Sequence, residues 1–93
     1  METYQVTHLA NKSRFEIRIG TLVAKLEYQI TNGNMTIHHT FVPTELRGQK
    51  LAEKLAAAAL EFARQSRLKV VPQCSYIEAY IRRNHPQSGQ IIS

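Results

Sequence analysis

The residues with the clearest chemical potential lie in one short segment, Pro43–Ala52, where a predicted strand leads into a predicted helix. A helix N-terminus carries unpaired N–H groups and a partial positive charge, so it can hold a phosphate group. Gly48 lets the backbone approach such a group closely, and Arg47 and Lys50 add positive charge to the same turn. From these residues alone, a phosphate-binding loop and an ordinary helix start have equal weight.

Two other side chains, His39 and Cys74, could do acid–base or nucleophilic chemistry. An imidazole titrates near neutrality and can take the proton of an amine. A cysteine at a helix N-terminus favours its thiolate, so it can act as a nucleophile or as a proton donor. The same spacing also fits a core histidine with one hydrogen bond and a small buried cysteine.

The four histidines and the single cysteine do not form a metal-binding pattern. His38 and His39 are adjacent on a predicted strand, so their side chains are expected to point to opposite faces. Neither a Cys-x-x-Cys nor a His-x-x-x-His spacing occurs. No metal is therefore predicted, and His8 and His85 are expected at the surface.

The elements that position these residues follow from hydrophobic periodicity. Apolar and polar residues alternate along 14–19, 22–30 and 35–41, which predicts strands of an antiparallel meander. Asn32-Gly33 is a strong hairpin signal, because both residues tolerate positive φ. Alternate residues of the third segment are expected to share one face: Met35, Ile37, His39 and Phe41.

The second half of the chain changes to helical spacing. Residues 48–66 predict an alanine-rich amphipathic helix, and Ser75–Asn84 predicts a second helix that Pro86 ends. Leu68–Val71 predicts a short strand between them, stopped by Pro72. The predicted order is β-β-β-β-α-β-α, in which the three segments above are preceded by a first strand without a periodic segment of its own. The crossover through the long helix implies one parallel pair in a mostly antiparallel sheet, so the fold class is α+β, a mixed α/β sandwich.

Composition limits the class of protein. The chain has 93 residues, 43% hydrophobic and 20% charged, so we predict one globular domain over residues 1–93. A lone cysteine excludes an internal disulfide, and the lack of a signal sequence or a membrane-length apolar run predicts a cytoplasmic protein. The charge of +5 suggests an anionic partner, but no aromatic-rich basic patch or recognition motif supports nucleic-acid binding. No long apolar stripe is left over, so a monomer is expected.

Three separated motifs resemble one known family. Residues 47–52, Arg-Gly-Gln-Lys-Leu-Ala, resemble the pyrophosphate-binding motif Arg/Gln-x-x-Gly-x-Gly/Ala of the GNAT acetyltransferase superfamily. His39-Thr40 before this motif and Pro72-x-Cys74-x-Tyr76 after it resemble the minimal GNAT-like family, whose members have about this length. Arg82-x-x-x-Pro86 resembles the family's basic-then-proline ending, so the resemblance covers about residues 12–86.

The resemblance implies a small N-acetyltransferase that binds acetyl-CoA where the sheet is splayed between its fourth and fifth strands. The pyrophosphate would sit on the amides of Gly48–Ala52, and strand residues would pair with the pantetheine arm. We therefore expect these cofactor-binding residues: Phe41, Val42, Arg47, Gly48, Gln49, Lys50, Leu51, Ala52, Tyr76 and Arg83. A core or rim aromatic and a solvated charge are the alternative interpretations of Tyr76 and Arg83.

The resemblance also implies that His39 and Cys74 face the thioester. We prefer direct transfer with His39 as base and Cys74 as proton donor or orienter, while covalent acetylation of Cys74 also fits. Lys50 stands where the family has glycine, so its side chain could crowd the phosphate or pair with it. The acceptor is an unidentified amine at an open site, because the extra N-terminal helices of full-size GNAT enzymes have no room here. A non-catalytic CoA-binding or partner-binding module is the alternative function.

Overall fold

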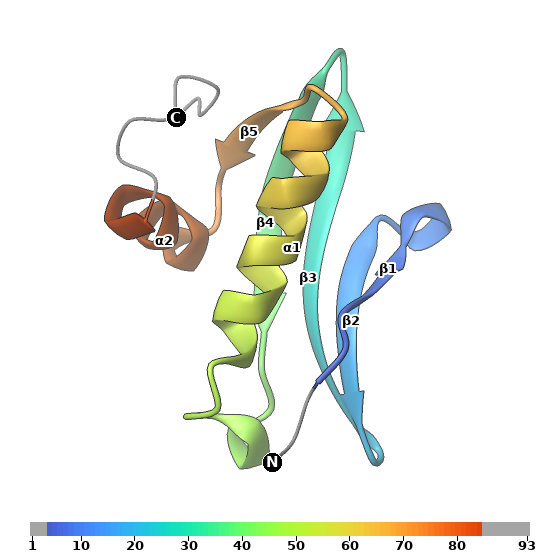
Figure 1. The fold of residues 1–93 in the computed structure, drawn as a ribbon, viewed down its shortest axis with the longest axis vertical. Helices are drawn as coiled ribbons and strands as arrows, with labels where there is room; N and C mark the ends of the chain where they lie inside the picture. The colour runs from blue at the N-terminus through green and yellow to red at the C-terminus, as the bar shows by residue number, and fades with distance from the viewer. Residues whose placement is uncertain (1–3, 85–93) are drawn as a thin grey trace.

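Five strands form one sheet in the order β1-β2-β3-β4-β5, in a computed structural model that describes residues 4–84 (Figure 1). The strands have these bounds: β1 Thr7–Leu9, β2 Arg14–Ile19, β3 Leu22–Thr31, β4 Asn34–Phe41 and β5 Lys69–Pro72. Neighbours from β1 to β4 pair antiparallel, and β5 pairs parallel with β4. The predicted α+β fold with one parallel pair is therefore confirmed.

Two α-helices accompany the sheet in the described part of the chain, α1 (Leu51–Gln65) and α2 (Ser75–Asn84). Short 3-10 turns, η1 (Ala10–Lys12) and η2 (Thr44–Leu46), precede β2 and α1. α1 crosses one face of the sheet, and α2 follows β5 beside it (Figure 1). Neither described helix is long and apolar enough to cross a membrane. The bounds of α2 agree with the prediction, and Pro86 lies outside the described residues.

The core lies between α1 and the sheet. Alternate strand residues fill the sheet side: Phe15, Ile17, Ala24, Leu26, Tyr28, Met35 and Ile37. α1 buries a stripe of small and aliphatic side chains against them: Leu51, Leu55, Ala56, Ala59 and Ala63. Each buried large aliphatic side chain contributes about 1.5–3 kcal/mol, and the alanines let the helix approach the strands closely. This packing holds α1 against the sheet.

His8 packs into an aromatic cluster near the C-terminal end of α1. Its ring stacks on Phe15, with centroids 4.1 Å apart and planes at 6°, and meets Phe62 edge-on at 4.4 Å. His8 Nε2 and the hydroxyl of Tyr28 share a hydrogen bond of 2.6 Å, and burial lowers the pKa of His8. The predicted surface position of His8 is therefore wrong, because His8 pairs in register with Phe15 and shares its core-facing side. His85 lies outside the described residues.

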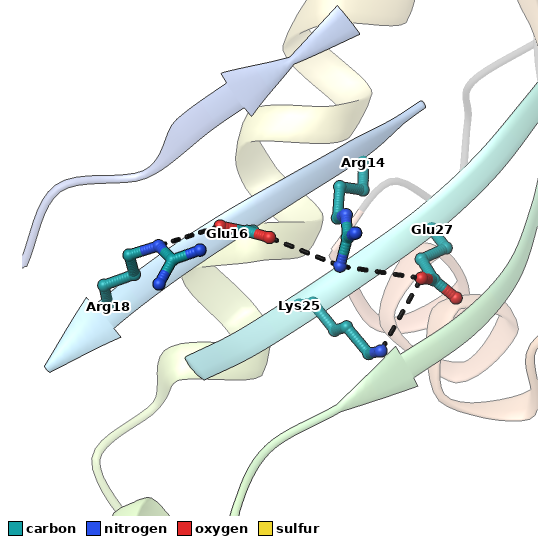
Figure 2. A network of polar contacts seen from close by, with 5 residues as sticks. All are labelled: Arg14, Glu16, Arg18, Lys25 and Glu27. Carbon is teal, nitrogen blue, oxygen red and sulfur yellow. Dashed lines mark hydrogen bonds and ion pairs between the residues drawn. The ribbon is translucent and has the colours of Figure 1, made fainter. Parts of the chain in front are cut away.

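The opposite face of the sheet carries a chain of ion pairs (Figure 2). Glu16, which is only 4% exposed, contacts Arg14 at 3.3 Å and Arg18 at 3.2 Å. Glu27 contacts Lys25 at 3.6 Å and Arg14 at 4.0 Å. The register places Arg14 opposite Glu27 and Glu16 opposite Lys25, so the charges alternate across β2 and β3. Ion pairs thus cover this part of the outer face.

A β-bulge at His38 changes the phase of β4. Glu27 pairs with His39, but the next residue of β3, Tyr28, pairs with Ile37, which leaves His38 as the extra residue. Because paired residues share a face, Ile37 lies with Tyr28 on the helix side, whereas His39 lies with Glu27 on the outer side. The predicted common face of β4 is therefore wrong beyond Ile37.

Candidate functional site

The loop before α1 is distinct from the helix. α1 begins at Leu51, later than the predicted start at Gly48. Gly48 and Lys50 have φ of +87° and +63°, and right-handed helix cannot continue through such residues. The predicted helix start is therefore wrong, and Arg47–Lys50 forms a separate turn, called the glycine loop below. Lys50 takes the left-handed conformation that glycine adopts without strain.

Several consecutive backbone amides in the glycine loop and the first turn of α1 have no hydrogen-bond acceptor in the described part of the chain. From Gly48 to Glu53, no backbone N–H donates to another described residue. The first helical hydrogen bond of α1 runs from Lys54 N to Lys50 O, at 3.2 Å. Free N–H groups across a positive-φ turn, next to the positive end of a helix dipole, form a donor set suited to an anion.

A cavity of about 410 Å³ adjoins these amides. Its wall combines the end of β4, η2, the glycine loop, the first turn of α1 and one residue of α2. The lining residues are Val42, Leu46, Arg47, Gly48, Lys50, Leu51, Ala52, Glu53 and Tyr76. Seven of the ten residues predicted to bind the cofactor are among them. Segments far apart in the sequence thus meet around one space.

The other three predicted residues do not line this cavity. Phe41 is 43% exposed and pairs with Lys25, so it lies on the outer face of the sheet. Gln49 turns toward the N-terminal segment, where its Oε1 accepts a hydrogen bond of 2.7 Å from the Tyr4 hydroxyl. Arg83 is exposed on α2. The side chain of Gln49 is therefore engaged outside the cavity.

The cavity wall carries charges of both signs. Arg47 donates from Nε to the carbonyl oxygen of Val42 at 3.1 Å, which ties the guanidinium to the end of β4. Lys50 is exposed at the same wall. Glu53 lies in the first turn of α1, where a carboxylate stabilises the helix through its dipole but repels an anion. Two cations and one carboxylate leave the wall with a positive excess.

Tyr76 forms the α2 side of the cavity. Burial first, and then the negative charge of Glu53, raise the pKa of Tyr76, so its hydroxyl stays protonated and can donate. The positive charge of Arg83 partly offsets this rise in the pKa of Tyr76. Arg83 thus influences Tyr76 electrostatically but does not line the cavity itself.

β4 and β5 separate beyond Ile37. Their parallel pairing joins Asn34–Ile37 to Lys69–Pro72. The amides of Gln73 and Cys74 then both donate to the carbonyl oxygen of Ile37, each at 3.1 Å, as the chain turns toward α2. In the described structure, the rest of β4 has no partner strand on this side. The sheet is thus open where the family resemblance implies the splay.

Cys74 and Thr40 meet across this opening. Cys74 Sγ donates to Thr40 Oγ1 at 3.5 Å. Thr40 pairs with Leu26, so it lies on the helix side of β4. Cys74 directly precedes α2, and its carbonyl accepts the amide of Glu78 at 3.0 Å, as expected for the residue that caps a helix. The thiol therefore sits at a helix N-terminus, beside a hydroxyl.

His39 lies on the other side of β4. It is exposed and stands opposite Glu27, and the hydrogen bond to Cys74 comes from its neighbour Thr40. The interpretation of His39 as a core histidine is therefore wrong.

No group of three or more His, Cys, Asp or Glu side chains within residues 4–84 is arranged to hold a metal ion.

Sequence reasoning missed four residues that the structure brings to this region: Tyr4, Thr40, Leu46 and Glu53. Thr40 stands in the quoted His39-Thr40 motif, but strict alternation would have turned it outward. Glu53 could have been found as the acidic residue of the first helical turn. Tyr4 contacts a residue 45 positions away, and no local pattern signals such a contact.

Comparisons with known proteins agree on one family. A family model described as GCN5-related N-acetyl-transferase matches residues 14–91. Protein NATD1 of Danio rerio is 33% identical over 88 residues, which cover 89% of this chain and 79% of that protein. Protein NATD1 of Gallus gallus is 34% identical over 83 residues, 86% of this chain and 76% of that one. The NMR structure of a GCN5-like protein from Staphylococcus aureus has a TM-score of 0.76 and 26% identity, covering 100% of this chain and 92% of that chain.

Proposed function

Because this chain belongs to the GCN5-related N-acetyltransferase family, we propose that it transfers the acetyl group of acetyl-CoA to an amine. One observation carries the proposal: the unpaired amides of Gly48–Glu53 adjoin a cavity of about 410 Å³ with a positive excess at its wall. A pyrophosphate needs such donors, and the cavity volume lies in the range of small-molecule sites.

The glycine loop fits a pyrophosphate group. At Gly48, nothing lies within 4 Å of the place where a Cβ would stand, so a phosphate can approach this amide. Arg47 and Lys50 would add positive charge, Arg47 from a fixed position and Lys50 from a flexible stem. The carboxylate of Glu53 in the same wall would repel the pyrophosphate, which weakens binding without preventing it.

The opening between β4 and β5 would take the pantetheine arm. Beyond Ile37, β4 offers its edge toward α2, and an exposed strand edge can hydrogen-bond the amide groups of an extended ligand. Val42 lines the cavity at one end of this stretch, and Cys74 lies along it. A ligand held by the glycine loop would therefore extend toward Cys74.

Acetyl-CoA would supply a thioester whose carbonyl carbon an amine can attack. We assign His39 as the base that takes the amine proton, and Cys74 as the proton donor or orienter, held by Thr40. A C–N bond forms as the C–S bond breaks, and the departing thiolate accepts a proton from Cys74 or from water. His39 and Thr40 point to opposite faces of β4, so the two groups would approach the opening from its two sides.

The acceptor would enter from the outer face of the sheet. His39 and Phe41 are exposed there. The amine can belong to a small molecule or to a protein, and we expect the chain to act as a monomer.

Thermal unfolding with and without acetyl-CoA tests the proposal first, with adenosine 3′,5′-bisphosphate and unrelated nucleotides as controls. At about 100 times its dissociation constant, a ligand stabilises by about 2.7 kcal/mol. For a domain of this size, that raises Tm by roughly 10 °C or more. Unchanged unfolding at millimolar acetyl-CoA would refute the proposal.

Variants then test the catalytic roles once an amine acceptor supports CoA release. His39→Ala is expected to lower kcat by about 10²–10⁴ while the KM for acetyl-CoA stays similar, because a base acts on the acceptor. His38→Ala is the matched control, since it removes the adjacent exposed imidazole. Cys74→Ala should lower kcat, whereas Cys74→Ser should retain part of it. Equal rates for His39→Ala and His38→Ala would refute the base role.

Acetyl-CoA binding without catalysis is the second candidate function. The position of His39 on the face of β4 opposite to Thr40 and Cys74 favours it. This function predicts stabilisation by acetyl-CoA without CoA release for any amine offered. The His39→Ala and Cys74→Ala variants would then bind acetyl-CoA as the unaltered protein does.

A further inference from the structure

We propose that Tyr4 is a positioning residue that holds the glycine loop in its binding shape from the N-terminal segment. This inference rests on the proposed acetyl-CoA site. The Tyr4 hydroxyl donates to Gln49 Oε1 at 2.7 Å and so joins residues 45 positions apart. Tyr4 is half-buried and packs against the hydrophobic core, so its hydroxyl is presented from a fixed base.

The glycine loop needs such a restraint. Its residues are exposed, and two of them, Gly48 and Lys50, have positive φ. Its ends are fixed, because Arg47 donates to the carbonyl of Val42 and the carbonyl of Lys50 accepts the first hydrogen bond of α1. Between these points, the amides from Gly48 onward make no hydrogen bond within residues 4–84. The side-chain hydrogen bond of Gln49 reaches the middle of this otherwise unsupported turn.

The geometry also explains why Gln49 would act indirectly. Gly48 and Lys50 line the cavity on either side of Gln49, but Gln49 does not. Its side chain turns to Tyr4 instead, which leaves the backbone of the loop facing the cavity. A loop that is already ordered binds its ligand without a further loss of conformational entropy. The hydrogen bond between Tyr4 and Gln49 should therefore raise the affinity for acetyl-CoA.

Removing this hydrogen bond is therefore expected to weaken acetyl-CoA binding. Tyr4→Phe deletes only the hydroxyl, and Gln49→Ala deletes its acceptor. The loss of one such bond corresponds to about a fivefold rise in Kd. The double variant should bind no more weakly than either single variant, and KM should rise while kcat stays similar. Tyr28→Phe is the matched control, because it removes another tyrosine hydroxyl, bonded at 2.6 Å to His8.

Backbone ¹⁵N relaxation of the ligand-free protein provides a second readout that does not depend on acetyl-CoA. Order parameters at Gly48 and Gln49 should be near the rigid value of about 0.85 in the unaltered protein and should fall in Tyr4→Phe. If the unaltered protein does not bind acetyl-CoA, the proposed function fails. The relaxation data still test whether Tyr4 holds the glycine loop in place. Unchanged order parameters of the glycine loop in Tyr4→Phe and Gln49→Ala would overturn the proposal that Tyr4 holds the loop in place. Additive losses of affinity in the double variant would overturn the coupling between them.

Discussion

Lys50→Gly is expected to stabilise the protein, although it removes a charged side chain from a proposed binding site. Lys50 holds φ at +63° and ψ at 29°. The left-handed conformation costs a residue with a Cβ about 1–2 kcal/mol. Glycine avoids that cost but adds about 0.5–1 kcal/mol of chain entropy to the unfolded state. The net gain is about 0.5–1 kcal/mol, which raises Tm by roughly 2–8 °C in a domain of this size.

Urea unfolding measures this gain directly. Lys50→Ala is the matched control, because it removes the ammonium group but keeps the Cβ and therefore the strained backbone. Lys50→Gly should unfold at a higher urea concentration than Lys50→Ala, with an unchanged slope m. If the two variants unfold together, backbone strain at Lys50 does not limit stability, and the argument from φ is refuted.

The same pair of variants separates two effects of the lysine on the ligand. If the ammonium pairs with a phosphate, both variants bind acetyl-CoA up to about fivefold more weakly, and the difference shrinks at high salt. If the side chain crowds the phosphate, both variants bind more tightly. We expect weaker binding, since Lys50 is exposed and its stem can turn outward.

Three further variants test the site and the core. Gly48→Ala should lower stability by about 1 kcal/mol through its φ of +87° and weaken acetyl-CoA binding in calorimetry, and unchanged affinity would contradict a phosphate at this amide. Glu53→Gln should bind acetyl-CoA more tightly, whereas Glu61→Gln, on the same helix but outside the cavity wall, should not. Burial lowers the pKa of His8 from 6.5, so the folded state binds fewer protons than the unfolded state. The contribution of His8 to stability is complete above that value and is lost as pH falls below it. Urea midpoints at about pH 8 and about pH 5 should therefore differ less in His8→Gln, and an equal difference would refute this role.

The sheet could be predicted from the sequence because its signals are local. Asn32 and Gly33 both take positive φ, 54° and 79°, as their residue types indicated. Alternation along β2 and β3 correctly separated Phe15 and Ile17 from the charged residues between them. The strand β1 is different: with three residues it is too short for periodicity to locate, and its pairing with β2 depends on tertiary contacts.

The start of α1 could not be placed from periodicity, because the residue that ends the loop carries no helix-breaking signal. Lysine is a good helix former, so Lys50 appeared to belong to the helix. Because the backbone at this position has a positive φ in this chain, a glycine would suit it for a reason beyond close approach to a phosphate. A glycine in the family motif at this position allows the left-handed conformation. That conformation would have predicted that α1 begins only after residue 50.

The bulge at His38 decides which side chain of β4 meets Cys74, and it cannot be predicted from β4 alone. A bulge is a mismatch between two strands, so its position depends on how β4 pairs with β3. With strict alternation, His39 would share the helix side with Ile37, and Thr40 would face outward. The extra residue reverses both, so Thr40 reaches the thiol while His39 stays accessible from the open face of the sheet. One inserted residue thus places His39, the proposed base, on one face of β4, and Thr40, which holds the proposed proton donor Cys74, on the other.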